Sequence, residues 1–429
     1  IVVNDNGMSI APNVGALPKH LQAIGDGETE NLFTALGFSY IGPIDGHDMD
    51  SLVAIIQAGW RQAHNRPVVL HVRTEKGKGW HAAEQDEKER GHAVKPFDPQ
   101  TGEALPAKGG NPSYTAYFAR ALNAAAARDE TIRALTAAMP SGTGVDAFAK
   151  THPQKAVDTG IAEQHAVTYA AGMATTGLKP FVCVYSTFLQ RAYDQIIHDV
   201  ALQNLPVRFV LDRAGLVGAD GATHNGVFDL AYLTALPNMV VMSPADEAEL
   251  IHMTTTAAAY NKGPIALRFP RGEAMGTALP EQPQVLPIGK GRIVQRGSGV
   301  AFLTLGSRLY AALSAASMLE EEGIDCTVAD ARFAKPIDTQ LIDVLAQHHH
   351  TIITVEEGNP GGFGDRVLRH MNDTGLLETV RLKTLTLPDG FIEHGNAAAQ
   401  YAAAGLDGAG LHQTALRCLR PNAPLRKHA

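Results

Sequence analysis

The chain has 429 residues, of which 45% are hydrophobic and 19% charged, and its net charge of -8 is compatible with a globular protein of two or three domains. The acidic balance and the lack of a Lys/Arg-rich arm argue against nucleic-acid binding, and no apolar run reaches the roughly 18 residues of a transmembrane helix. Three widely spaced cysteines and no expected signal peptide predict a reducing compartment, the cytoplasm.

Strand-like runs alternate with helix-like runs along the chain, which predicts an α/β protein with mainly parallel sheets. In the first block, residues 1–3 predict the end of a buried strand, 49–63 a helix and 67–74 a strand. The Pro/Gly-rich stretch "KPFDPQTGEALPAKGGNPS" predicts a linker to the second block.

The second block contains the expected strands "PFVCVYST", "VRFVLD", "MVVMS" and "PIALRFPR". We expect a helix at about 189–203 and another that begins with Ser243 as its cap, Pro244 in its first turn and Asp246 completing the cap. The third block repeats this alternation, with a helix near 308–322, but has few convergent polar residues. We therefore expect it to give structural support or a dimer contact.

The segment "NDNGMSI" follows the first expected strand and gathers several oxygen atoms in one turn. Asn4, Asp5 and Asn6 offer the amide and carboxylate oxygens that Mg²⁺ prefers. Asn and Asp are also common in ordinary turns, where their side chains bond nearby backbone groups. The tripeptide alone favours the ordinary turn and leaves the metal site open.

Glu163 lies near the start of an expected helix in "DTGIAEQHAVTYAAGMA", with apolar neighbours that include Ile161. A carboxyl group in such surroundings can relay protons near neutral pH. The alternative, which this segment alone favours, is that Glu163 only complements the dipole at the helix N-terminus.

The segment "YSTFLQRAYDQ" places an aromatic group and a cation after a strand. Phe188 and Arg191 are three residues apart and can share a helical face, close to Tyr185. This pattern suits stacking on a flat ring beside an anion. A core aromatic residue with a solvated arginine is the alternative.

The Gly-rich loop "DRAGLVGADGATHNG" follows a strand, at the sheet edge where α/β proteins bind ligands, and its length favours a functional role. His224 is a candidate for proton transfer, and Arg213 is a candidate phosphate ligand. Arg271 follows another strand end, so the two arginines suit a phosphate monoester. Arg268 lies within that strand and is less free to bind a ligand.

Taken in order, "NDNGMSI", "GPIDGHD", "KGKGW", "GIAEQHAVTYAAG", "YSTFLQRAYDQ", "DRAGLVGADGATHNGVFD" and "FAKPID" resemble the 1-deoxy-D-xylulose-5-phosphate synthase family of the transketolase superfamily. The resemblance covers nearly the whole chain and implies three doubly wound, mainly parallel-sheet α/β domains, the first one incomplete. These are the C-terminal part of a diphosphate-binding domain plus linker (1–112), a pyrimidine-binding domain (113–280) and a transketolase C-terminal domain (281–429).

The resemblance implies an enzyme that condenses pyruvate with D-glyceraldehyde 3-phosphate, with decarboxylation, at the start of non-mevalonate isoprenoid synthesis and also for thiamine synthesis. It implies thiamine diphosphate and Mg²⁺ as cofactors, and a homodimer. Glu163 would bond the aminopyrimidine ring, and His224 would handle protons during carboligation. The other implied cofactor residues are Asn6 and Met8 as metal ligands, Ile10, Lys76, Ile161 and Phe188. The other implied substrate residues are Tyr185, Arg191, Arg213, Asp220 and Arg271, and His92 would lie in a segment near the site.

The chain departs from the family pattern in two places. The family's Gly-Asp-Gly motif, whose aspartate is a third Mg²⁺ ligand, and its N-terminal catalytic histidine would precede Ile1, so we expect the N-terminal part of the first domain to be absent. The stretch 18–32 is also shorter than in the family. Asp26 in "IGDGETEN" follows Asn6 and lacks the required strand–helix context, so we expect a turn there.

Two alternatives remain on the sequence alone. One is a transketolase or a 2-oxo acid dehydrogenase β-type enzyme, against which the loop with Asp220 and His224 argues. The other is a non-catalytic fragment, which the missing aspartate and histidine favour for this polypeptide taken alone.

Overall fold

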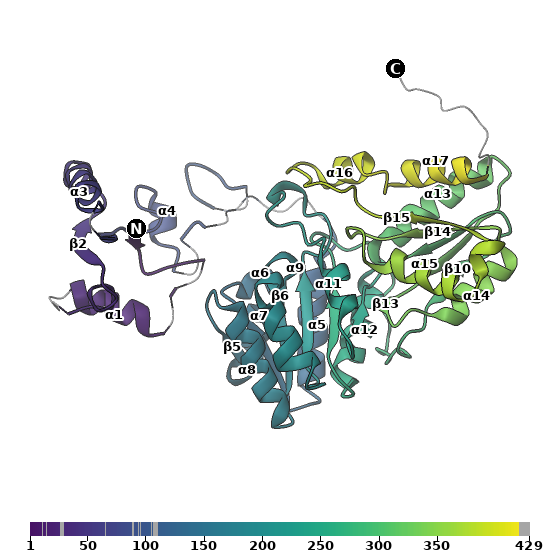
Figure 1. Cartoon of the computed structure of the whole chain (residues 1–429), viewed down its shortest axis with the longest axis horizontal. Coiled ribbons are helices and arrows are strands. Elements are labelled where there is room, and N and C mark those ends of the chain that lie inside the picture. Colours follow the sequence, from purple (N-terminus) through teal and green to yellow (C-terminus); the bar gives the residue numbers. More distant parts are fainter. Residues whose placement is uncertain are drawn as a thin grey trace, which may run out of the picture. The chain divides into compact units, whose positions relative to one another are not determined.

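The computed structural model describes residues 1–10, 12–13, 15–25, 30–64, 66–87, 90–92, 94, 96–103, 105 and 110–419. The chain divides into two compact units, Ile1–Gly109 and Gly110–Ala429, and each is described by itself (Figure 1). The expected turn at Asp26 lies outside the described residues.

Unit 1 contains a small parallel sheet in the order β1-β3-β2, formed by Val2–Asp5, Val68–Arg73 and Ser39–Asp45. Its helices are α1 (Ala16–Gly25), α2 (Leu32–Ala35), α3 (Met49–Gln62) and α4 (His81–Glu84). The strand β3 is buried along most of its length because it is the central strand. The expected burial of the first strand is wrong for this unit, since Ile1 is 72% and Val2 57% exposed.

The first part of unit 2 is built on a seven-stranded sheet in the order β13-β8-β9-β7-β6-β4-β5. All pairs are parallel except β13 with β8. The strands are β4 (Ile132–Thr136), β5 (Ala156–Asp158), β6 (Lys179–Tyr185), β7 (Arg208–Asp212), β8 (Val240–Met242), β9 (Ile265–Arg268) and β13 (Phe333–Lys335). The helical segments are α5 (Tyr114–Ala126), α6 (Pro140–Thr143), α7 (Val145–Thr151), η1 (Pro153–Lys155), α8 (Glu163–Thr175), α9 (Ser186–Leu189), η2 (Gln190–Ala192), α10 (Tyr193–Gln195), η3 (Ile196–Ala201), η4 (Gly218–Asp220), α11 (Asp229–Ala235) and α12 (Glu247–Ala259).

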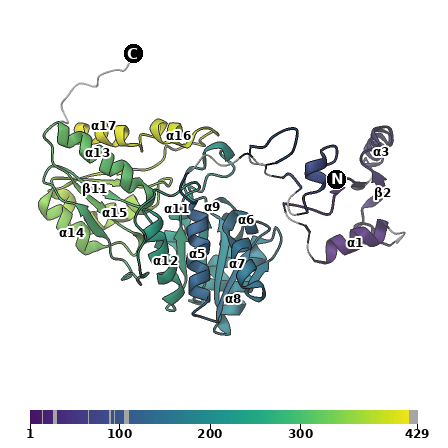
Figure 2. The same ribbon diagram turned by 180° about the vertical axis from the view of Figure 1, so that it is seen from behind.

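The core of this sheet forms where helices α5 and α12 pack together against it (Figure 2). Phe118 and Leu122 from α5 meet Leu250 and Met253 from α12, and all four side chains are buried. These residues recur at helical spacing, so each helix turns one apolar face toward the strands.

A second sheet in unit 2 has five strands in the order β10-β12-β11-β14-β15, parallel except for β10. The strands are β10 (Arg292–Gln295), β11 (Ala301–Thr304), β12 (Thr327–Asp330), β14 (Thr351–Val355) and β15 (Arg381–Leu385). The helical segments are η5 (Gly306–Arg308), α13 (Leu309–Glu321), α14 (Thr339–His348), α15 (Phe363–Asp373), η6 (Leu376–Glu378), α16 (Ala397–Ala403) and α17 (Gly408–Leu419). Because β13 leaves this region to join the first sheet, the second and third sequence blocks share a sheet. The expected α/β class with mainly parallel sheets is confirmed.

Two expected helices differ from the structure. The segment expected as one helix at 189–203 is a succession of short turns that ends in the π-helix Ile196–Ala201. Ser243 does not cap the next helix: Asp246 does, because its side chain accepts a hydrogen bond from Glu249 N at 2.9 Å. The helix α12 therefore begins at Glu247, after the Ser-Pro pair.

Two further expectations concern membranes and cysteines. Within the described ranges, every helix is too short or too polar to cross a membrane. Cys183, Cys326 and Cys418 are free thiols and all three are buried, which confirms Cys183 and Cys326 as the core residues expected from their strand-like segments.

Candidate active site

Glu163 is the first residue of α8 and is only 2% exposed. The carboxylate is paired with a cation, since Arg191 Nη1 lies 3.0 Å from Oε1 and 2.9 Å from Oε2. Its position at a helix N-terminus also favours negative charge. The purely apolar surroundings expected for Glu163 are therefore wrong, although its burial is confirmed.

Phe188 lies at the centre of a group of aromatic rings just after β6. Its ring stacks on Tyr185, with centroids 5.8 Å apart, and meets His224 edge-on at 5.3 Å. Arg191 Cζ lies 5.9 Å from the Phe188 centroid. The structure thus brings together four residues that the sequence predicted for one site, from two separate segments.

A close backbone approach fixes the orientation of Tyr185. A Cβ atom at Gly142, in α6, would lie 1.8 Å from Tyr185 Oη, so the tyrosine needs glycine at that position. Arg213 Cζ lies 3.8 Å from the centroid of the Tyr185 ring, and Arg213 Nη1 donates to Gly142 O at 3.0 Å. Tyr185 is therefore held between a glycine and a guanidinium group.

Asp220 joins the two arginines that the sequence predicted as phosphate ligands. Its Oδ2 lies 3.8 Å from Arg213 Nε and 3.3 Å from Arg271 Nε. Arg213 is in the left-handed region with φ 59°, a conformation that is uncommon for residues other than glycine. Both predicted phosphate ligands thus converge on one carboxylate. Arg268, in contrast, is buried and paired with Asp229 at 2.8 Å, as its place within the strand predicted.

The sequence analysis missed Asp212, which ends β7 directly behind Arg213. Asp212 Oδ2 accepts a hydrogen bond from Thr115 Oγ1 at 2.6 Å, and Oδ1 lies 3.5 Å from Arg213 Nη1. Burial raises the pKa of Asp212 to about 6, and the nearby Arg213 only partly opposes this shift. Burial also raises the pKa of Tyr185 to about 12. An aspartate at the end of a strand, just before the predicted phosphate ligand, was the signal available in the sequence.

The predicted cofactor residues of unit 1 gather around one turn. Asn6 Oδ1 accepts from Met8 N at 3.0 Å, which is the bond expected of an ordinary Asx turn. Lys76 Nζ donates to Ser9 O at 2.6 Å and Ile10 O at 3.3 Å. A carbonyl oxygen has two lone pairs, so the bond to Met8 leaves Asn6 Oδ1 with capacity for a cation. The turn therefore offers an amide oxygen that fits a metal ligand.

The side chains of the neighbouring residues Asn4 and Asp5 bond instead to the adjacent strand β3 and to the residue that follows it. Thr74 Oγ1 donates to Asn4 Oδ1 at 2.5 Å, and Asp5 Oδ2 lies 3.0 Å from His71 Nε2. Among the described residues, no group of three or more His, Cys, Asp or Glu side chains could hold a metal. Any cation at this turn would therefore depend on amide and backbone oxygens.

The remaining predicted residues lie at the surface. Ile161, which precedes α8, is 55% exposed. His92 is exposed in unit 1. Neither residue makes a contact that assigns it a role within its unit.

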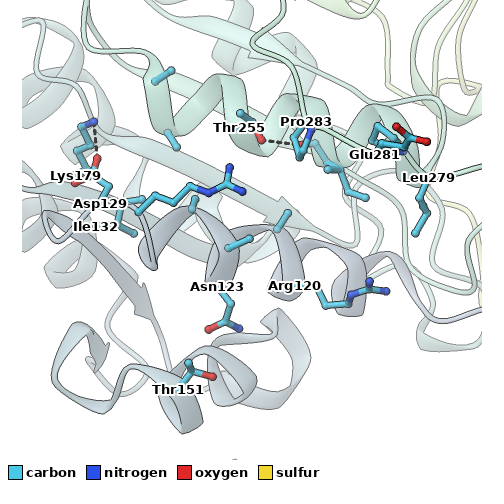
Figure 3. Close-up of a pocket in the computed structure, with 18 residues that line it drawn as sticks. Arg120, Asn123, Asp129, Ile132, Thr151, Lys179, Thr255, Leu279, Glu281 and Pro283 are labelled. Carbon is cyan, nitrogen blue, oxygen red and sulfur yellow. Dashed lines mark hydrogen bonds and ion pairs between the residues drawn. The ribbon is translucent and has the colours of Figure 1, made fainter.

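A large groove of about 720 Å³ lies elsewhere on unit 2, between α5 and α12 (Figure 3). Alanine side chains of both helices form much of its wall, and Arg120, Asp129 and Lys179 lie around it. None of the predicted site residues lines this groove. The groove is therefore separate from the group of residues that the sequence predicted for the site.

Three family models match the chain. Residues 26–74 match the model described as 1-deoxy-D-xylulose-5-phosphate synthase. Residues 111–276 match the transketolase pyrimidine binding domain, and residues 289–411 match the transketolase C-terminal domain. The two transketolase models together cover most of unit 2.

Known proteins give a consistent picture. A 1-deoxy-D-xylulose-5-phosphate synthase from Rhodobacter capsulatus is 50% identical over an alignment of 463 residues, which covers 99% of this chain and 72% of that protein. A solved split gene transketolase, an inactive beta4 tetramer, has a TM-score of 0.64 at 29% identity and covers 72% of this chain and 99% of that chain. A transketolase from Leishmania mexicana, with a TM-score of 0.60 at 18% identity over 75% of this chain and 48% of that chain, shows the fold alone.

We predict that Asp212→Asn flattens the pH dependence of stability between about pH 4 and pH 6. The native carboxyl group keeps its proton up to about pH 6, whereas the unfolded group, with a pKa of 3.8, loses it earlier. Stability contributed by the protonated form is therefore lost as the pH rises through this window, by at most about 3 kcal/mol. The measurement is the free energy of urea unfolding at several pH values.

The matched control is Asp389→Asn, which changes an exposed aspartate in the same unit. It should leave the slope of stability against pH unchanged. Parallel curves for the wild type and Asp212→Asn would contradict the assignment of the raised pKa to Asp212.

Proposed function

The chain belongs to the 1-deoxy-D-xylulose-5-phosphate synthase family, and we propose that it forms 1-deoxy-D-xylulose 5-phosphate from pyruvate and D-glyceraldehyde 3-phosphate with loss of carbon dioxide. The observation that carries the assignment of product is the 50% identity to a named synthase along 99% of the chain. The two transketolase domain matches make the chain a thiamine diphosphate-dependent transferase. A transketolase or dehydrogenase activity has weaker support, since the split gene transketolase is only 29% identical.

Glu163 and Phe188 are the residues of unit 2 that we propose for cofactor binding, with Ile161 beside them. When bound, thiamine diphosphate supplies the carbanion chemistry, which protein side chains alone cannot. The fit rests on Glu163, a buried carboxylate that can accept a hydrogen bond from a ring nitrogen, and on the half-buried ring of Phe188. Arg191, which is about half exposed, would have to release at least one Glu163 oxygen for this bond.

The turn in unit 1 is our proposed binding site for Mg²⁺ and the diphosphate. Asn6 would contribute its amide oxygen and Met8 its backbone carbonyl, which are hard ligands suited to Mg²⁺. Lys76 would offer its ammonium group to a diphosphate, and Ile10 would support the cofactor. The bonds from Lys76 to the backbone at Ser9 and Ile10 support this role, because they hold the cation beside the turn.

Arg213 and Arg271 are the proposed ligands of the acceptor phosphate. Their convergence on Asp220 supports this proposal, because two guanidinium groups that reach one carboxylate are close enough to bind one phosphate. Tyr185 and Arg191 would line the substrate site, and His224, in edge contact with Phe188, would move protons to and from the acceptor oxygen. Asp220 would then act as a counter-ion that the phosphate partly replaces.

The domain division at 1–112, 113–280 and 281–429 is also a proposal. Its support is that each of the last two segments supplies most strands of one sheet, although β13 crosses between them. We further propose a cytoplasmic location, which the three free, buried cysteines support.

The test of the proposed function is direct. The purified chain should form 1-deoxy-D-xylulose 5-phosphate from pyruvate and D-glyceraldehyde 3-phosphate only when thiamine diphosphate and Mg²⁺ are both present. Product is measured by mass spectrometry, and a parallel assay offers a ketose donor in place of pyruvate. Turnover of the ketose donor alone would overturn the assignment, and no cofactor binding at all would favour a non-catalytic fragment.

We predict that Glu163→Ala lowers kcat at least about a thousandfold, because it removes the proton-sharing carboxylate. Glu163→Gln should lose nearly as much, since an amide cannot exchange the proton. The control Glu130→Gln changes a largely exposed carboxylate and should keep wild-type kcat. A Glu163→Gln enzyme with near-normal turnover would refute the proposed role.

We predict that Arg271→Ala raises KM for D-glyceraldehyde 3-phosphate about tenfold or more, because one charge-assisted contact to the phosphate is lost. KM for pyruvate should change much less. Arg120→Ala, an arginine of the groove remote from the predicted site residues, is the control. An unchanged KM for the phosphorylated aldehyde would exclude Arg271 as a phosphate ligand.

We also propose that the exposed face of α8 pairs two copies of the chain. Tyr169 is 43% exposed and stacks on His165, and Ile161 and Leu202 nearby are 55% and 74% exposed. Large exposed apolar side chains of this kind often mark protein contacts. Tyr169→Glu should halve the mass found by sedimentation equilibrium, whereas Val344→Glu on α14 should not. A dimer that survives Tyr169→Glu would exclude this face.

A further inference from the structure

The helix α16 of the last domain reaches the loop that carries Asp220. Gln400, in this helix, is only 6% exposed. Its Oε1 accepts from Gly218 N at 3.1 Å, and its Nε2 lies 3.4 Å from Gly218 O. Nε2 also donates to Glu393 O at 2.7 Å. The buried amide group of Gln400 therefore bonds both the N–H and the carbonyl of Gly218, the first residue of the turn η4.

Gln400 and Arg271 hold opposite ends of one peptide group. The peptide between Val217 and Gly218 gives its N–H to Gln400, while its carbonyl accepts from Arg271 Nη1 at 2.9 Å. Peptide groups are planar, so fixing the N–H direction also fixes the direction of the carbonyl. Gln400 thus determines the direction of the Val217 carbonyl, to which Arg271 bonds.

Asn225 holds the same loop to the segment before α16. Asn225 is 5% exposed, accepts from Val217 N at 3.1 Å and donates to Ile392 O at 3.1 Å. Gly395 N also donates to Gly218 O at 3.1 Å. The turn η4 is therefore fixed from the last domain at several points, of which Gln400 is the buried side chain that contacts Gly218 directly.

We propose that Gln400 is a positioning residue for recognition of the acceptor phosphate. It orients the Val217–Gly218 peptide, which holds Arg271, and the turn that places Asp220 between Arg271 and Arg213. The inference rests on the proposed function, because the phosphate is the ligand of these arginines there. It assigns the last domain a part in substrate recognition beyond the structural support expected from the sequence.

Loss of Gln400 should loosen the turn without unfolding the domain. Gln400→Leu keeps the approximate volume and removes both hydrogen-bonding groups, so the Gly218 N–H loses its buried partner. Gln400→Glu keeps an acceptor but places a second oxygen against the carbonyls of Gly218 and Glu393. Both variants should let Arg271 and Asp220 move. The matched control is Gln413→Leu, which changes an exposed glutamine in α17.

The first measurement compares two acceptors in the thiamine diphosphate-loaded enzyme. For Gln400→Leu, KM for D-glyceraldehyde 3-phosphate should rise about tenfold, which corresponds to the loss of one well-placed contact. KM for unphosphorylated D-glyceraldehyde should stay within about twofold of the wild-type value. Gln400→Glu should show the same selectivity, and Gln413→Leu should show neither change. Equal effects on both acceptors, or no effect on either, would overturn the proposal.

The second measurement does not depend on turnover. Amide hydrogen exchange of a peptide that covers residues 216–222 should be faster in Gln400→Leu, whereas a peptide from α12 should be unchanged. Unaltered exchange at 216–222 would refute the positioning role of Gln400 even in an active enzyme. If exchange is faster in Gln400→Leu but the wild-type chain forms no 1-deoxy-D-xylulose 5-phosphate, then Gln400 does hold the turn and the proposed function is wrong.

Discussion

The loop between β7 and α11 depends on a steric constraint where its two ends meet. Gly215 and Gly226 exchange backbone hydrogen bonds of 2.8 and 2.9 Å, which close the loop at its base. A Cβ atom at Gly215 would lie 2.0 Å from Glu357 Oε2, and one at Gly226 would lie 2.4 Å from Arg213 O. A side chain at Gly226 would press on the backbone at the start of the loop, and one at Gly215 would displace the Glu357 carboxylate, so both positions favour glycine where the ends of the loop meet.

Glu357 extends this constraint into the last domain. Its carboxylate accepts from Ser307 Oγ at 2.5 Å and Tyr401 Oη at 2.9 Å, and it lies 2.5 Å from Arg308 Nε. Arg268 donates to Glu357 O at 3.0 Å. The three partners of the carboxylate all lie in the last domain, whereas the bond from Arg268 in β9 joins Glu357 to the first sheet and so links the two sheets. The shared strand β13 also links the two sheets, and the loop between β7 and α11 is consequently supported by both halves of unit 2.

The sequence predicted the strands well because each is a short apolar run between turn residues, as β6 and β7 show. It predicted the grouping of Tyr185, Phe188 and His224 because strand ends of a parallel sheet meet at one edge. It failed at 189–203, where packing breaks an apparently regular helix. Gln400 was missed because its partner Gly218 lies 182 residues away in sequence and no local pattern marks it. Asp212 was missed although its place at a strand end was a local signal, because its partner Thr115, which shows its burial, lies 97 residues away.

The balance of charges among the predicted site residues explains why Arg191 pairs with Glu163. Three carboxylates, on Glu163, Asp212 and Asp220, face three guanidinium groups, on Arg191, Arg213 and Arg271. Each guanidinium therefore already has an anionic partner in the protein. In the proposed binding mode, an entering phosphate would compete with Asp220 for two of them, which would weaken nonspecific anion binding and favour ligands that offer several oxygens at once. A ring nitrogen bonded to Glu163, as proposed for the cofactor, would likewise compete with Arg191, which is about half exposed and pairs with that carboxylate.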